Sequence, residues 1–119
     1  FSIMIRYQGE DIEFGLRLKQ VTQNDMQTWN DARRIVAYFY THTNHIVKFS
    51  SLIESGYNKM EKQSATVLTG VIRSADTKVM EGTLYCTIYI MPRVGDIEQE
   101  RRVITGITIE STPIKQEAT

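Results

Sequence analysis

The segment MEGTLYCTIYIMPRVGD, residues 80–96, alternates along its length and constrains the fold more than any other part of the chain. On one side of an extended backbone lie Leu84, Cys86, Ile88 and Ile90, and tyrosines and threonines alternate with them. Successive strand residues point to opposite faces of a sheet, so the aliphatic row is expected to be buried. The tyrosine and threonine row should then face outward or meet a second layer.

Composition indicates one globular domain. The 119 residues are 41% hydrophobic and 24% charged, which suits a single core. Equal numbers of basic and acidic residues, 14 each, argue against a globally basic nucleic-acid binder. Cys86 is the single cysteine, which excludes an internal disulfide. Because Phe1 already lies in a predicted strand, we expect one core domain over residues 1–119 that lacks an upstream amino-terminal arm.

The first half of the chain predicts a hairpin followed by two helices. FSIMIRYQ and IEFGLRLK alternate around the turn-forming GED, which is typical of a β-hairpin. TWNDARRIVAYFY has apolar residues at helical spacing, and Thr28 with Asp31 forms a capping box. A second helix is expected over HIVKFSSLIES, whose apolar stripe is Ile46, Phe49 and Ile53.

The second half is rich in strand-forming residues. ATVLTGVIR, GTLYCTIYIM and RRVITGITIE are runs of valine, isoleucine, threonine and tyrosine, separated by polar turn sequences. The expected fold class is therefore α+β in the order ββααβββ. In this fold an antiparallel sheet of about five strands carries the two helices on one face.

Catalytic motifs are lacking in the sequence. His42 and His45, with Glu54 downstream, have tolerable metal-ligand spacing, but exposed loop histidines are the favoured interpretation. The glycines are isolated and form no phosphate-binding loop, and no acid is placed to complete a hydrolytic triad. We therefore expect no enzyme activity, no cofactor, no metal and no small-molecule substrate. One open alternative is a small-ligand pocket lined by Trp29, Tyr85 and Tyr89.

Charge placement provides candidate binding residues. If the two predicted helices pack side by side, they form one basic face. This face would suit acidic lipids or a ribonucleoprotein, and its residues are Arg33, Arg34, Lys48, Lys59 and Lys62. An ordinary solvated helix face is the alternative. Tyr57 and Met60 are expected in an exposed loop that inserts into a membrane interface or a partner's groove, unless the loop folds back over the helix end.

The order of these elements resembles the globular core of rhabdovirus matrix proteins. The similarity runs from about Ile12 to Glu110 and is carried by TWNDARR, HIVKFSSLI, EGTLYCTIYI and QERRVITGITIES. It implies a non-enzymatic structural protein of the virion and host cytoplasm that self-associates, condenses the viral nucleoprotein–RNA complex and drives budding. The resemblance also implies binding to acidic lipids on the inner face of a membrane. It places Lys59, Met60 and Lys62 in a loop for self-association or membrane contact.

Two features depart from that family. The chain has neither a proline-rich budding motif nor a lysine-rich arm, both of which would precede the core, and its short loops favour a plant- or insect-virus relative. An alternative resemblance is to the nuclear-transport-factor-like periplasmic scaffold subunit of type IV secretion systems, whose last strand is similar to RRVITGITIESTPI. That fold normally begins with helices, whereas this chain begins with a predicted hairpin.

Overall fold

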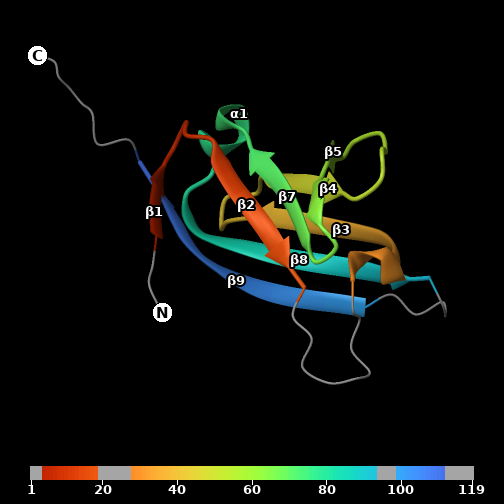
Figure 1. The fold of residues 1–119 in the computed structure, drawn as a ribbon. Coiled ribbons are helices and arrows are strands. Elements are labelled where there is room, and N and C mark those ends of the chain that lie inside the picture. The colour runs from red at the N-terminus through yellow and green to blue at the C-terminus, as the bar shows by residue number, and fades with distance from the viewer. Residues whose placement is uncertain (1–3, 19–27, 94–98, 112–119) are drawn as a thin grey trace, which may run out of the picture.

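The computed structural model describes residues 4–18, 28–93 and 99–111, and most of them belong to two stacked β-sheets. In spatial order, the larger sheet contains β1 (Met4–Tyr7), β9 (Gln99–Glu110), β8 (Gly82–Pro92), β3 (Ala32–Tyr40), β4 (Ile46–Ser50) and β5 (Asn58–Lys59). The smaller sheet contains β2 (Ile12–Arg17), β7 (Val67–Ile72) and β6 (Glu61–Ser64). Figure 1 shows β2 and β7 crossing one face of the larger sheet, which we call its inner face.

The predicted α+β fold with two helices packed on a sheet is wrong. Within the described residues, helical structure is confined to a 3-10 turn at Trp29–Asp31 and to α1 at Ser74–Thr77. The capping box predicted at Thr28 is confirmed, because the Thr28 hydroxyl accepts from the Asn30 N–H and the Asp31 carboxylate accepts from the Thr28 N–H. It caps one short turn, and strand β3 follows immediately.

The first predicted helix is strand β3. The prediction failed because both faces of this segment carry large apolar or aromatic side chains. Ile35 and Phe39 face inward and pair with β8, whereas Tyr38 and Tyr40 face outward. A strand with apolar or aromatic residues on both faces lacks the alternation of apolar and polar residues, so its apolar positions can also match a helical period. The β-branched and aromatic content, which favours strands, decides the outcome here.

The second predicted helix is strand β4 and the loop after it. Val47 and Phe49 are buried in the inner face, whereas Lys48 points outward. The expected apolar stripe does not exist, because Ile46 and Ile53 are both exposed.

The predicted amino-terminal hairpin is also wrong in its pairing. β1 runs parallel to β9 in the larger sheet, and β2 runs antiparallel to β7 in the smaller one. Gly9 adopts a positive φ of 89° at the turn between them, so the chain does turn there, but it passes from one sheet to the other. Short-range turn chemistry therefore located the turn without fixing the partners of the two strands.

The aliphatic row of β8 is buried, as its alternation predicts. Leu84, Cys86, Ile88 and Ile90 are each no more than 6% exposed. Burial raises the pKa of the Cys86 thiol to about 12, so it behaves as an apolar core side chain.

An aromatic cluster joins the two sheets, and in it Phe39 and Phe49 are buried whereas Phe14 is partly buried. The ring centroid of Phe14 in β2 lies 4.5 Å from that of Phe39 and 4.8 Å from that of Phe49. Gly70 in β7 leaves room for this ring, since a β-carbon there would lie 2.6 Å from Phe14 Cζ. The glycine thus allows the Phe14 ring to pass across strand β7.

Candidate functional site

A basic pocket of about 220 Å³ lies where the beginning of β3 meets the edge of the smaller sheet. Its cationic side chains are Arg33, Lys59, Lys62 and Arg93, and no carboxylate side chain among the described residues lines it. Its apolar lining includes Ile35, Leu52, Met60 and Leu68. Grouped cations over an apolar floor favour an anionic group attached to an apolar body.

The 3-10 turn organises the rim of this basic pocket. The Asn30 carbonyl accepts a hydrogen bond from Arg93 Nε, and the Asn30 side-chain oxygen accepts one from Lys62 Nζ. Arg93 is held a second time because its backbone N–H donates to the Asp31 carbonyl over 3.0 Å. The turn therefore links a strand end of the larger sheet to the edge strand β6 of the smaller one.

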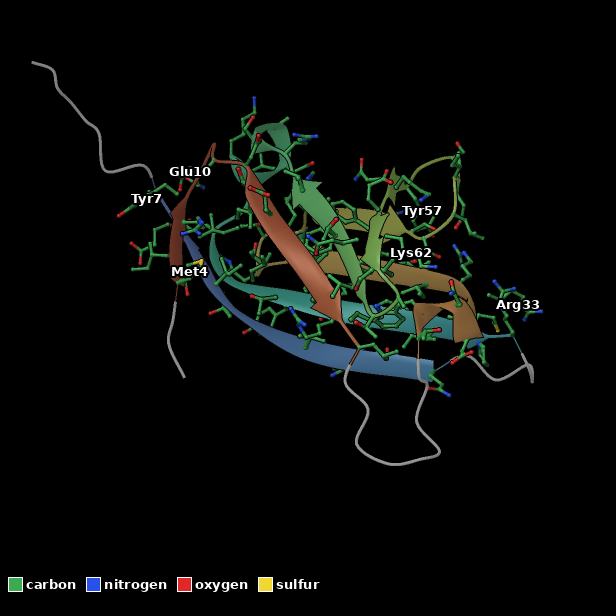
Figure 2. The ribbon with its side chains drawn as sticks, in the orientation of Figure 1. Met4, Tyr7, Glu10, Arg33, Tyr57 and Lys62 are labelled. Carbon is green, nitrogen blue, oxygen red and sulfur yellow. The ribbon has the colours of Figure 1, made fainter. Side chains whose placement is uncertain are left out.

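Only part of the predicted basic face is assembled. Arg33, Lys59 and Lys62 meet at the basic pocket, but Arg34 and Lys48 belong to the outer face of the larger sheet, beside Tyr57. The predicted face assumed two helices side by side. In a strand the neighbours Arg33 and Arg34 point in opposite directions, so the face divides. Figure 2 shows Arg33 at the end of the molecule away from Met4 and Tyr7.

Arg93 is the pocket cation that sequence reasoning missed. It follows Pro92, which pairs with Ala32 at the start of β3. The pairing of β3 with β8 places Arg93 beside the 3-10 turn. This pairing was not foreseen, because the β3 segment was predicted to be a helix.

An exposed apolar tip stands next to the basic pocket. Leu52, which lines the pocket, is 45% exposed, and the next residue, Ile53, is 91% exposed. Backbone bonds hold the base of this β4–β5 loop, since Ser51 N–H donates to the Ile35 carbonyl and Leu52 N–H to the Ser50 hydroxyl. The loop therefore projects two large aliphatic side chains from a fixed base.

An ion pair fixes the other side of the same loop. Arg34 Nε and Nη2 donate to the two carboxylate oxygens of Glu54 over 2.7 and 2.9 Å, and the Ser50 hydroxyl donates to one of them. These bonds lower the pKa of Glu54, and the bond from Arg34 has a larger effect than the bond from Ser50. The Glu54 carboxylate in turn raises the pKa of Arg34. Glu54 is thus engaged by Arg34 and Ser50 while Leu52 and Ile53 point into solvent.

The predicted exposed pair Tyr57 and Met60 is only half right. Tyr57 is partly exposed and lies beneath the guanidinium of Arg34, whose Cζ is 5.5 Å from the ring centroid. Met60 is 0% exposed, which contradicts its predicted place in an exposed loop. The chain crosses from β5 in the larger sheet to β6 in the smaller sheet at this residue, so Met60 enters the core between them.

The outer face of the larger sheet carries a second group of side chains, which we call the tyrosine face. It comprises Tyr38, Tyr40, Tyr57, Tyr85 and Tyr89. The ring planes of Tyr40 and Tyr85 are 29° apart with centroids separated by 5.8 Å. The predicted small-ligand pocket is not formed as such, because Trp29 is buried on the inner side, where its indole N–H donates to the Leu16 carbonyl.

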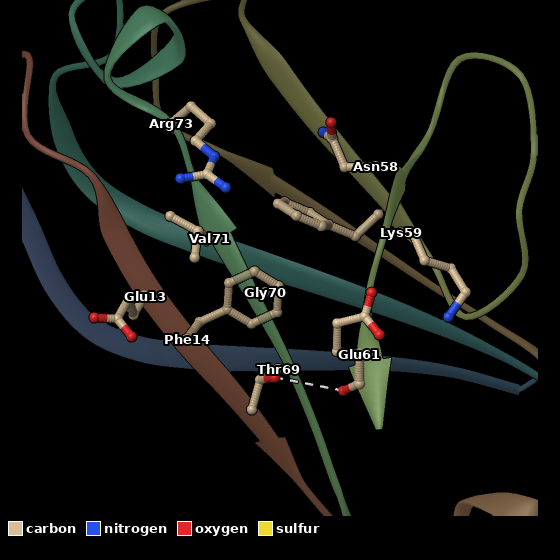
Figure 3. Close-up of a pocket in the computed structure, with 10 residues that line it drawn as sticks. Glu13, Phe14, Asn58, Lys59, Glu61, Thr69, Gly70, Val71 and Arg73 are labelled. Carbon is tan, nitrogen blue, oxygen red and sulfur yellow. Dashed lines mark hydrogen bonds between the residues drawn. The ribbon is translucent and has the colours of Figure 1, made fainter. Parts of the chain in front are cut away.

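A separate depression, of about 390 Å³, opens between β7 and β5 (Figure 3). Phe14 and Phe49 line its floor, and charged residues of both signs stand around it, including Lys59, Glu61 and Arg73. The Thr69 hydroxyl donates to the Glu61 carbonyl over 3.4 Å across its rim, as Figure 3 shows. Its mixed charges give it less preference for an anion than the basic pocket has.

The histidines do not form a metal centre within the described part of the chain. His45 Nε2 lies 2.8 Å from Asp76 Oδ1, whereas the His42 ring lies against Gly82. No group of three or more histidine, cysteine, aspartate or glutamate side chains is placed to hold a metal in residues 4–18, 28–93 and 99–111.

Comparisons with known proteins assign no family. No protein-family model and no curated protein sequence matches this chain. Across the described residues, no helix has the length and apolar character needed to span a membrane. Both the matrix-protein and the secretion-scaffold resemblances stay predictions, and the helices that each expects in the first half of the chain are strands.

Proposed function

We propose that this chain is a non-enzymatic structural module that docks on the surface of membranes rich in anionic lipids. The observation that carries the proposal is the position of the Leu52–Ile53 tip beside the basic pocket. An apolar tip next to grouped cations matches the two layers of such a membrane, acyl chains below phosphate groups. A virion matrix role is the more specific form of this proposal, with the membrane's inner face as its location.

The two parts of the site act through different forces. Each basic side chain near an anionic leaflet contributes on the order of 1 kcal/mol, and this attraction weakens as salt rises. Burying a leucine or isoleucine contributes about 1.5–3 kcal/mol and does not depend on charge screening. Together they support weak, reversible binding that would become firm when several copies act together.

Nucleoprotein binding and self-association remain further proposals for the same protein. The basic pocket is the surface on which an RNA-bound partner would compete with lipid. Tyr57 is partly exposed and can take part in self-association, whereas Met60 is buried and cannot.

Liposome co-sedimentation tests the membrane proposal. Wild-type protein should bind vesicles containing phosphatidylserine and leave vesicles of phosphatidylcholine alone in the supernatant. Arg33→Glu combined with Lys62→Glu should abolish binding, since it reverses two of the four pocket cations. Ile53→Ser should weaken binding without changing its salt dependence.

The matched control changes the same number of charges elsewhere. Lys48→Glu with Lys78→Glu alters two exposed lysines outside the basic pocket and should leave binding largely intact. Both double variants should melt within a few degrees of the wild type, because exposed charges contribute little to folding. Equal loss of binding in the two double variants would show that only overall charge matters, and the proposal would be rejected.

A further inference from the structure

The tyrosine face is a fixed aromatic platform. Tyr40 Oη is 3.0 Å from the Thr87 hydroxyl, and Tyr38 Oη is 3.2 Å from Tyr57 Oη. The second bond raises the pKa of Tyr38 to about 12 and lowers the pKa of Tyr57. The ring of Tyr38 also meets that of Tyr89 edge to face, with centroids 5.5 Å apart. These contacts fix the rings before any ligand arrives, which lowers the entropy lost on binding.

Two adjacent depressions lie along this platform. One, of about 430 Å³, is lined by Tyr38, Tyr40, Tyr89 and neighbours, and the other, of about 460 Å³, contains Tyr85. They share Tyr40 and Arg102, so they form consecutive parts of one shallow track. A track with two connected parts suits a chain-like ligand of repeating units.

The track carries charges of both signs and few of them. Lys48 and Arg102 are basic, Glu100 is acidic, and the Arg34 guanidinium beside Tyr57 is paired with Glu54. A polyanion such as single-stranded nucleic acid would gain little from two cations and would meet the Glu100 carboxylate. A neutral ligand with many hydroxyl groups can instead donate to the carboxylate and accept from the cations.

We propose that the tyrosine face binds a neutral oligosaccharide. The apolar C–H face of each sugar ring would lie on a tyrosine ring, while its hydroxyls bond to Lys48, Arg102 and Glu100. This site uses residues other than those of the basic pocket and does not depend on membrane binding. A protein partner that occupies the same platform is the competing possibility, and the test below separates the two.

Isothermal titration with neutral hexasaccharides of glucose, mannose, galactose and N-acetylglucosamine tests the proposal. At least one should bind, with an affinity that added salt leaves nearly unchanged. Tyr85→Ala should weaken that binding about tenfold or more, because it removes an exposed stacking ring. Tyr85→Phe keeps the ring and should bind like the wild type.

Tyr7→Ala, on β1 and outside the platform, is the matched control and should leave sugar binding unchanged. Melting curves of all variants exclude unfolding as the cause of any loss. Absence of binding to every hexasaccharide would overturn the proposal, as would binding that Tyr85→Ala does not alter. Tyr85-dependent binding of a single-stranded RNA hexanucleotide that exceeds sugar binding would also overturn it.

Discussion

The two faces of the larger sheet are made by the same strands but have different chemistry. On the inner face, Ile88 and Phe39 are buried against the smaller sheet. On the outer face, Tyr85 is 45% exposed, and Tyr38 and Tyr89 are partly exposed and contact each other. The inner face holds the fold together, whereas the outer face is available for binding. An apolar or aromatic side chain in a strand therefore does not by itself show which face forms the core.

Ile88→Ala should produce the largest loss of stability and tests the inner face. Removing a buried isoleucine costs about 2–5 kcal/mol through lost transfer energy and the cavity left behind. Chemical denaturation should show a clearly lower midpoint. The control is Tyr89→Ala on the neighbouring position of the same strand, where the partly exposed ring leaves a smaller loss. Equal losses at the two positions would indicate that another layer also covers the outer face.

Gly70→Ala should have an intermediate effect and tests how the two sheets meet. The new β-carbon would lie 2.6 Å from Phe14 Cζ and 3.2 Å from Phe49 Cε2, so the aromatic cluster must shift. Overpacking of this kind costs about 1–3 kcal/mol.

Phe14→Leu provides a matched test of the Gly70 clash. Combined with Gly70→Ala, it should cost less than the sum of the two single changes, because the smaller side chain relieves the contact. Strict additivity in denaturation measurements would show that Phe14 is not the residue that requires glycine at this position.

The smallest expected effect concerns Glu54, whose ion pair with Arg34 holds the β4–β5 loop. Its pKa is lowered in the folded protein, so its ion pair stabilises the fold at pH values above the ordinary glutamate pKa of about 4.3. That contribution is lost as the pH falls through the lowered pKa. Glu54→Gln should therefore melt slightly below the wild type at pH 7, and the difference should disappear in acid. A difference that persists in acid would assign the effect to packing.

Several sequence predictions were confirmed because local pattern alone determines them. The clean alternation of Leu84, Cys86, Ile88 and Ile90 is compatible only with a strand that has one buried face. The cap at Thr28 and the turn at Gly9 also follow from short-range chemistry. The prediction that five basic residues form one face is a different case, because only Arg33, Lys59 and Lys62 of that group share a pocket.

The sequence by itself determined the strand-rich second half, the buried face of β8 and the local turns. Only the tertiary structure decided that Ala32–Tyr40 and Ile46–Ser50 are strands, that β1 pairs with β9, and that Met60 is buried. The physical reason is that strand pairing joins residues far apart in the chain, and a strand with apolar or aromatic residues on both faces shows no clear period of two. The same long-range pairing places Arg93 beside Lys62 and gathers the tyrosines on one face.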